Sequence, residues 1–588
     1  MSGFHRFSIV MRMVFMCILI IPVFAGLIGV LMPAFGFFPA LGENQISLQP
    51  FSQLLANDNV LSMSWLSLST GLIATLLALM GALLLVAVFY QRAWLNRIQH
   101  LLSPLLVVPH AAAAIAFLFI LSPSGWLARL FSGSDMNNPL PPDWAFPYDP
   151  YGLSIILALT LKELPFVFLM LLSTLSQPQL EIKVKGYLKV AQSLGYSQIT
   201  AFMTIVVPMI YSHIRMPLLA VLAFATANVE VPLILGPNDP PTLAVAVLRW
   251  FNHVDLSMRF QASAAAVLQL LVTLTALACW WLAEQVIRKL SRHALLSGKR
   301  TWGDDVLTLL AVAVVFVYSV IALLLLASVY TWSVATYWPF PQLLPDGFTL
   351  MHWQTALRSL AVPLANSIIL AFSVTVFAVV LVLLALEGEL QMTKHMSAAM
   401  GRLDRSIMHI TLYLPLLVPG VAFLFGLVWF QQMYFSHLTW VHLFVSHLIY
   451  VLPYVFISLA VAYRRMDPRY VKVAYGLGKT PITVFFAVKL PMLFGPIAVA
   501  FALGLAISFS QYLPTLLSAG GNIATVTTEA VAAASGSSRR LSAVYVVVQI
   551  IMPLCGFILA WWLPNVFFKP SLKANPKNQG IKVYESNP

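Results

Sequence analysis

The sequence is short of charge and almost without cysteine. Only 9% of its 588 residues are charged, and its three cysteines are Cys17, Cys279 and Cys555. A soluble domain carries about 25% charged residues, so a water-exposed surface of ordinary extent is excluded. Each cysteine lies in an apolar run, and no Cys or His spacing is typical of a metal site. The sequence therefore predicts neither paired disulfides nor metal ligands, and it contains no Ser/His/Asp set or carboxylate pair typical of an enzyme.

Long apolar runs take the place of charge. Hydrophobic residues make up 60% of the chain, and the mean hydropathy is +0.88. Runs near the ~20 residues needed to cross a bilayer predict about twelve membrane-spanning helices. They lie at about 9–32, 65–90, 101–122, 152–175, 209–235, 263–287, 305–330, 364–387, 409–431, 441–463, 493–515 and 542–565. The predicted fold class is an all-α polytopic membrane protein embedded in a lipid bilayer.

The placement of positive charge tests this count. The formal net charge of +13 would suggest a nucleic-acid partner in a soluble protein, but in a membrane protein the side of each loop matters more. With the N-terminus inside, the predicted cytoplasmic segments hold 24 of the 33 Lys and Arg residues, and three more lie in or beside spans. The predicted outer segments hold six arginines and no lysine. This pattern predicts a multi-pass protein with both termini in the cytoplasm and no nucleic acid.

Two stretches of the sequence repeat each other. "YLKVAQSLGYSQITAFMTIVVP" (187–208) aligns without a gap to "YVKVAYGLGKTPITVFFAVKLP" (470–491). The matched pairs are Tyr187 and Tyr470, Lys189 and Lys472, Val190 and Val473, Ala191 and Ala474, Leu194 and Leu477, Gly195 and Gly478, and Pro208 and Pro491. Both stretches fall between the fourth and fifth spans of a six-span unit, which predicts two parallel halves. We assign the halves to 1–290 and 305–568, a cytoplasmic joint to 291–304 and a polar tail to 569–588.

Each repeated stretch predicts a short helix followed by a turn. Tyr470, Val473, Ala474 and Leu477 follow the i, i+3, i+4, i+7 spacing of one helix face, and the twin stretch repeats it. Gly195 and Gly478 stand where helices commonly end in a left-handed residue, and the two prolines open the next span. The letters Gly-Lys-Thr resemble the end of a phosphate-binding loop, but Val473 stands where that motif needs glycine. Such a helix could lie on lipid or dock to a partner, and its duplication favours docking.

The spacing of the two loops resembles the E-A-A-x-x-x-G-x9-I-x-L-P loop of binding-protein-dependent ABC importer permeases. Two such loops in one chain are similar to the fused permeases of the thiamine and ferric-iron branch. The resemblance implies a type I importer permease fold, with coupling loops at 181–208 and 464–491. It also implies a bacterial inner-membrane location, two copies of a separate ATPase subunit that binds ATP and Mg, and a periplasmic protein that delivers a small solute. This chain would then hold no cofactor of its own.

The two loops depart from that family pattern in the same way. The acidic first position is Lys189 and Lys472 here, and the second residue is Val190 and Val473 in place of alanine. Any salt bridge made by the usual glutamate must therefore be absent or reversed. Because both copies depart alike, we expect a matched ATPase partner and not decay of the loops.

A few polar residues interrupt the apolar runs. Glu230 lies near the outer end of the fifth span, and the matching stretch of the twin half has Gln511 and Tyr512 as its polar groups. Ionisable groups at membrane depth commonly face a cavity or partner. We expect these three to line the translocation path, with Glu230 favouring a cationic solute; the alternative is a surface residue that reaches water. Lys162 and Glu163 are expected to pair with neighbouring spans. His110 and His447 are expected to be satisfied core residues.

A second class of protein fits part of this pattern. An ion-gradient-driven secondary transporter also has twelve spans in two halves. The duplicated amphipathic loop favours the ABC permease, whereas a secondary carrier would show several mid-span ionisable residues, of which the sequence has few. A membrane-embedded enzyme is disfavoured by the lack of a catalytic constellation.

Overall fold

The computed structural model describes residues 3–132, 140–296, 298–393, 398–536 and 538–567. Within these ranges every named element is a helix, and β-type pairing is limited to two isolated bridges. Backbone polar groups cannot find water inside a bilayer, and a helix satisfies them within one segment. The predicted all-α fold is therefore confirmed. The predicted tail from residue 569 lies outside the described residues.

The described residues of the first half form fifteen elements. In chain order they are α1 (Gly3–Ala34), η1 (Pro39–Leu41), α2 (Gln49–Leu55), α3 (Val60–Phe89), α4 (Trp94–Val107), α5 (His110–Leu121), α6 (Trp126–Ser132), α7 (Leu153–Leu175), α8 (Pro178–Ser193), α9 (Gln198–Ala201), η2 (Phe202–Val206), α10 (Val207–Thr226), α11 (Glu230–Leu235), α12 (Leu243–Phe251) and α13 (Met258–Leu296).

The second half runs from α14 to α25. Its elements are α14 (Asp304–Val334), α15 (Met351–Thr393), α16 (Ala398–Leu417), α17 (Gly420–Phe435), α18 (Thr439–Arg465), α19 (Pro468–Gly476), α20 (Pro481–Val484), η3 (Phe485–Lys489), α21 (Leu490–Met492), α22 (Phe494–Ser510), α23 (Leu513–Ala519), α24 (Val526–Ala534) and α25 (Arg539–Phe567). The elements η2 and η3 are single π-helical turns.

The number of membrane-length helices agrees with the sequence. Ten described helices are long and apolar enough to cross a bilayer, and two bent pairs raise the number to twelve. The bent pairs are α16 with α17, at 91°, and the segment 481–492 with α22, at 76°. Pro419 opens α17 at the first bend, where its missing N–H removes one helical hydrogen bond. The first bend breaks the predicted span at 409–431, whereas the second lies at the start of the predicted span at 493–515.

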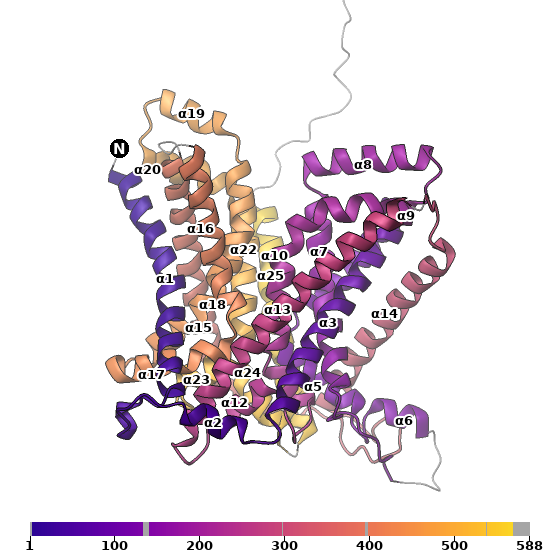
Figure 1. Cartoon of the computed structure of the whole chain (residues 1–588), viewed down its shortest axis with the longest axis vertical. Coiled ribbons are helices and arrows are strands. Elements are labelled where there is room, and N and C mark those ends of the chain that lie inside the picture. The colour runs from indigo at the N-terminus through magenta and orange to yellow at the C-terminus, as the bar shows by residue number, and fades with distance from the viewer. Residues whose placement is uncertain (1–2, 133–139, 297, 394–397, 537, 568–588) are drawn as a thin grey trace, which may run out of the picture.

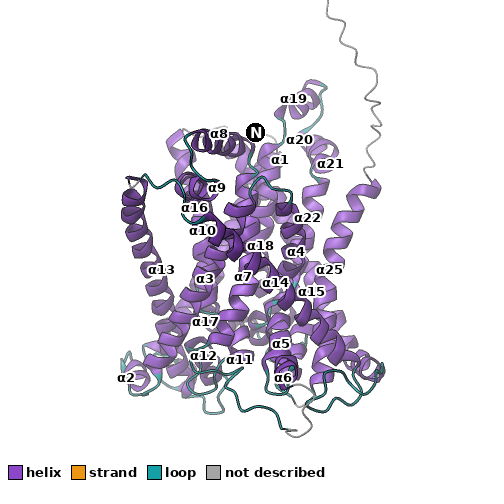
Figure 2. Cartoon of the chain, turned by 90° about the vertical axis from the view of Figure 1, so that its right-hand side faces the viewer, coloured by secondary structure: helices purple, strands orange, loops and turns teal. Residues whose placement is uncertain are grey.

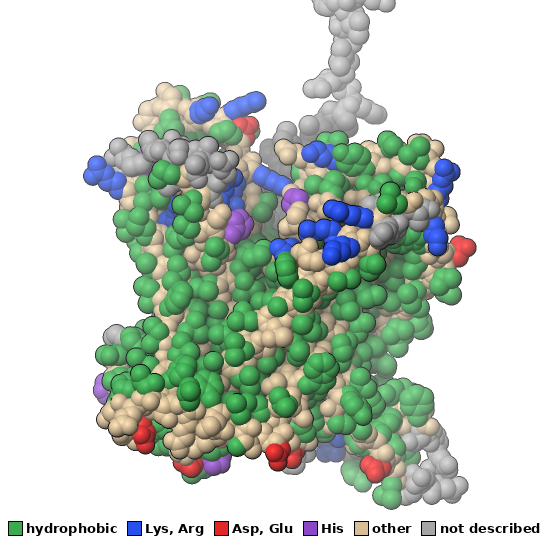
Figure 3. Space-filling view, viewed as in Figure 1, with side chains coloured by type: hydrophobic (Ala, Val, Ile, Leu, Met, Phe, Trp, Pro, Cys, Tyr) green, Lys and Arg blue, Asp and Glu red, His purple; other side chains and the backbone are tan. Residues whose placement is uncertain are grey.

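The long helices run side by side in one bundle (Figures 1 and 2). The short helices α8 and α19 lie across the same end of the bundle, and α1 begins and α25 finishes there (Figures 1 and 2). Lys and Arg side chains gather at this end, which is notched between the lobe that carries α8 and the lobe that carries α19 (Figure 3). We call it the basic end.

The first helix of each half packs against the other half. Helix α1 contacts α15, α16 and α17, while α14 contacts α3 and α5. At the crossing of α1 and α17 the backbones nearly touch: a Cβ on Gly26 would stand 2.1 Å from the Phe423 carbonyl oxygen, and one on Gly426 would stand 2.0 Å from the Gly26 carbonyl oxygen. Small residues allow such approach where lipid supplies no hydrophobic drive between helices. The exchange of first helices binds the halves into one body.

The structure repeats beyond the predicted loops. Thr242 precedes α12 and Thr525 precedes α24 at the same offset of 283 residues that relates the loops. The first N–H of each helix donates to a serine of a long helix: Leu243 to Ser67 at 2.9 Å, and Val526 to Ser367 at 3.0 Å. Side-chain oxygens at these positions satisfy donors that a helix start leaves unpaired. The two serines therefore mark corresponding positions of α3 and α15, which lie 300 residues apart in the sequence.

Candidate functional site

The two predicted loops have the same geometry in both halves. Gly195 and Gly478 both have left-handed backbones, with φ of 83° and 74°. In the first loop the N–H of Gly195 donates to the Gln192 carbonyl and that of Tyr196 to the Ala191 carbonyl, both at 3.0 Å. In the second loop the N–H of Gly478 donates to the Tyr475 carbonyl at 2.9 Å and that of Lys479 to the Ala474 carbonyl at 3.1 Å. Both helices thus end in the six-to-one closure that glycine favours.

The segment after each turn is also matched. Ser197 and Thr480 cap the next short helices, since their side-chain oxygens accept from the N–H groups of Thr200 and Thr483 at 3.2 and 3.3 Å. The π-helical turns η2 and η3 follow at the same offset, and the prolines Pro208 and Pro491 stand at the second residue of α10 and α21. Thr480 therefore acts as a helix cap, and not in the phosphate-binding role that the letters Gly-Lys-Thr suggest.

The face of each loop helix divides into buried and exposed parts. Ala191 and Ala474 point into the bundle, with 3% and 8% of their surface exposed. The other predicted stripe residues face outward with at least half of their surface exposed: Tyr187, Val190 and Leu194 on the first loop, and Tyr470, Val473 and Leu477 on the second. The two lysines at the family's acidic position, Lys189 and Lys472, are exposed beside them. Each loop therefore presents an aromatic-aliphatic stripe with a positive charge.

The loops differ in length. Helix α8 has 16 residues and α19 has nine. The longer helix buries Val184 and Leu188 as well as Ala191, whereas α19 buries only Ala474 among its residues. The predicted joint, residues 291–304, contacts the first loop, because the Ser197 N–H donates to the Arg300 carbonyl at 2.9 Å.

The predicted path residues meet where the two halves face each other. Glu230 opens α11, and its Oε1 accepts from the backbone N–H of Tyr512 at 3.3 Å. The side chain of Tyr512 is buried, with 6% exposed, while those of Glu230 and Gln511 are half-buried. Glu230 is thus placed between the halves and not on an outer surface. Tyr512 meets it through the backbone, a contact that residue type alone does not predict.

The other polar residues of the spans pair with neighbours as expected. Lys162 Nζ donates to the carbonyls of Leu105 and Leu106, at 2.9 Å each, and so satisfies the end of α4 before the break at Pro109. His110 Nε2 lies 3.0 Å from Glu163 Oε1. His447 is bonded on both nitrogens, to Ser508 and Thr515, at 2.9 and 2.8 Å.

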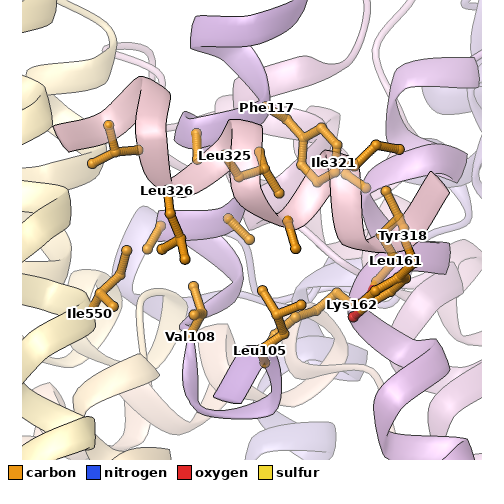
Figure 4. Close-up of a pocket in the computed structure, with 16 residues that line it drawn as sticks. Leu105, Val108, Phe117, Leu161, Lys162, Tyr318, Ile321, Leu325, Leu326 and Ile550 are labelled. Atoms are coloured by element: carbon orange, nitrogen blue, oxygen red, sulfur yellow. The ribbon is translucent and has the colours of Figure 1, made fainter. Parts of the chain in front are cut away.

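Lys162 also reaches the rim of an apolar cavity (Figure 4). Leu105 and Val108 from the α4 end, Ile321 and Leu325 from α14, and Ile550 from α25 line it. Because the ammonium group is held by two carbonyls, we assign this cavity no part in the path. No group of three metal-ligating side chains occurs among the described residues.

Two buried ion pairs were not predicted. Lys489, assigned to a cytoplasmic loop by its sequence position, is only 4% exposed and pairs with Glu387 of α15. Arg12 of α1, 2% exposed, pairs with Asp404 of α16 at 2.7 Å. The signal was present in the sequence as charges at the edges of apolar runs, but only the tertiary fold pairs residues so far apart in the chain.

The fold and these sites together describe a polytopic helical membrane protein with two similar halves, each presenting an exposed loop helix at one end. The chain is similar to the inner membrane ABC transporter permease protein YnjC of Escherichia coli (strain K12), with 29% identity over 495 residues. That match covers 83% of this chain and 86% of the relative. No protein-family model matches the sequence.

Proposed function

We propose that this chain is the membrane-spanning translocation subunit of an ATP-binding-cassette importer. The observation that carries the proposal is the matched pair of loop helices, each with an exposed Tyr, Val and Leu stripe fixed by a left-handed glycine. Exposed apolar patches of this kind mark interaction sites. The similarity to an inner-membrane ABC permease over most of both chains supports the same function.

The proposed assembly has two ATPase subunits at the basic end, one on each loop. Their closure on ATP would move α8 and α19 together and rock the two halves, so that the path between them opens to one side and then to the other. A periplasmic binding protein would deliver the solute at the opposite end. The chain would lie in a bacterial inner membrane with both termini in the cytoplasm, and ATP and Mg would bind the partner subunits. As a fusion of two permease halves it would belong with the thiamine and ferric-iron branch.

Isolation of the chain from its own membranes tests this proposal. In mild detergent we expect an ATP-hydrolysing subunit to co-purify, at two copies per chain. The competing class, an ion-gradient-driven carrier, would be isolated without an ATPase and would retain solute movement when ATP is absent. That outcome would overturn the proposed function.

Glu230 is proposed to act on the solute within this function. A carboxylate between the halves would favour a positively charged solute. Glu230→Gln keeps the size of the side chain and an oxygen that can accept from Tyr512. We expect uptake of a cationic solute to fall about tenfold, with assembly unchanged, since one charge contact is worth roughly 1–3 kcal/mol. Unchanged uptake and solute preference would remove Glu230 from the path.

A further inference from the structure

The second loop is attached to its half differently from the first. After the first loop the chain runs on through α9, η2 and α10 without a break, from Gln198 to Thr226. After the second loop the chain bends by 76° between the segment 481–492 and α22. A continuous helix transmits a push along its axis, whereas a bent connection yields unless a second contact bridges it. The structure therefore raises the question of what stiffens the second loop.

A buried polar cluster stands immediately before this bend. Lys489, the last residue of η3, donates to Glu387 Oε2 of α15, and Tyr463 Oη of α18 donates to the same oxygen. Gln391 Nε2 donates to Glu387 Oε1 at 2.9 Å. The three central side chains, Glu387, Lys489 and Tyr463, are at most 4% exposed. The cluster thus joins the loop segment to two long helices through one carboxylate.

The charge of Glu387 also acts on the loop helix. Partial burial, and then the negative charge of Glu387, raise the pKa of Tyr475, which lies on α19. At the rim, Arg464 makes a two-pronged bond to Glu389, with N···O distances of 2.9 and 3.0 Å. α15 and α18 are therefore joined by one ion pair, Arg464–Glu389, and by the hydrogen bond from Tyr463 to Glu387, and the Lys489–Glu387 ion pair joins α15 to the segment that follows α19.

The first half has no charge at the matching positions. The offset of 300 fixed by Ser67 and Ser367 matches Glu387 with Ala87, and the loop offset of 283 matches Lys489 with Val206. Tyr463 matches Leu175 through the helix prolines Pro165 and Pro453. Ala87, Val206 and Leu175 are all at most 2% exposed and lie in one apolar cluster. The matching positions therefore form an apolar contact in the first half, where the helix after the loop is unbroken. In the second half, where the chain bends after the loop, they form an ion pair.

We propose that Glu387, Lys489 and Tyr463 form a joint that transmits movement of the second loop to α15 and α18, in place of a continuous helix. Apolar contacts let helices slide, while a hydrogen-bonded ion pair fixes one register. The three residues are positioning residues, since none of them touches the solute or ATP. The proposal rests on the proposed function, because it assumes that an ATPase moves α19.

The test replaces the cluster by its first-half counterparts. The variant Glu387→Ala/Tyr463→Leu/Lys489→Val removes every charge of the joint and installs residues that pack in the first half. It is studied in the full chain with its ATPase, with Cys17, Cys279 and Cys555 changed to Ser. Spin labels at Val254→Cys and Leu438→Cys, two exposed sites in loops of opposite halves, report movement between the halves without knowledge of the solute.

We expect the triple variant to assemble and to hydrolyse ATP while the ATP-dependent change in label distance falls at least about twofold, since a coupling loss of about 0.5–2 kcal/mol changes an equilibrium about 2- to 30-fold. An undiminished distance change would overturn the joint. Glu284→Gln is the matched control: Glu284 also binds a cation and a tyrosine, Arg215 and Tyr211, but it connects α13 to α10 and not to a loop. We expect that control to retain the full distance change.

A second comparison decides the question if the triple variant does not assemble. Lys489→Arg keeps the ion pair and Lys489→Met removes it at similar volume. We expect the distance change to survive in the arginine variant and to be lost in the methionine variant; equal responses would contradict the proposal. A wild-type complex that hydrolyses no ATP would instead contradict the proposed function, and the joint with it.

Discussion

Replacing both Gly195 and Gly478 by Asp is expected to abolish capture of the ATPase subunit. Each glycine has a positive φ, which costs a residue with a side chain roughly 1 kcal/mol. A carboxylate at the end of a helix adds about 0.5 kcal/mol, because the C-terminal end of the helix dipole is negative. At each loop these two costs, about 1.5 kcal/mol together, lower the affinity for the ATPase subunit by about tenfold. The losses at the two loops multiply when one complex needs both. The measurement is the amount of ATPase that co-purifies with the full chain.

The chain offers matched controls for this experiment. Gly476 and Gly186 lie on the same two helices, are exposed, have no left-handed backbone and would place a Cβ in open space. Gly186→Asp/Gly476→Asp therefore adds the same charge without disturbing either turn. We expect it to retain capture. If the turn variants bind the ATPase as well as the controls do, the loops are not its docking site.

Removal of Glu387 alone is expected to cause the largest loss of stability. Glu387→Ala leaves the ammonium group of Lys489 buried without a counter-charge, and breaking a buried pair in this way costs about 3–5 kcal/mol. The variant Glu387→Ala/Lys489→Val leaves no unpaired charge, and it should recover most of that loss. Thermal unfolding of the purified complex measures both, with the single variant expected to be the less stable.

The opposite ranking would contradict this account. If the single and double variants unfold at the same temperature, Lys489 must find water or another partner once Glu387 is gone, and the site would not be dry. Glu389→Ala is the comparison for a pair with one side open to water, because its partner Arg464 keeps 43% of its side chain exposed while Glu389 keeps 10%. There we expect a loss of no more than about 1 kcal/mol.

The sequence was sufficient to predict the spans and the loops because both depend on local patterns. An apolar run of about 20 residues has few alternatives to a membrane helix, and the twin stretches carry their own helix face, closing glycine and proline. The left-handed turns at Gly195 and Gly478 follow from those patterns. The inward position of Ala191 does not, because the spacing put it on one face with residues that the structure leaves exposed. The bends at Pro419 and after Met492 were missed, since hydropathy measures the length of a run and not its direction.

Long-range pairing could not be predicted in the same way. Lys489 lies inside the repeated motif and was assigned to a water-exposed loop, yet it pairs with a residue about a hundred positions earlier. Arg12 pairs with Asp404 of the other half because the first helices are exchanged, and no local pattern records that exchange. The contact of Glu230 with the Tyr512 backbone depends likewise on how the two halves meet.

The two halves combine a shared docking shape with unlike connections to the bundle. The exposed stripe and its closing turn repeat residue by residue, which suits two copies of one partner subunit. The helix length, the bend and the buried ion pair do not repeat. A fused chain can vary its halves independently, so equal pushes from two identical subunits need not give equal movements. The proposed joint would restore a stiff connection where the helix is bent.

Photo-crosslinking from the loop helices tests the central claim most directly. A photoreactive amino acid at position 187 or 470, where each tyrosine is more than half exposed, is activated in native membranes. The control is position 151, an exposed tyrosine in the loop that precedes α7. The account predicts that both loop positions form an adduct with the same ATP-binding subunit and that position 151 does not. Adducts with lipid alone at positions 187 and 470 would contradict it.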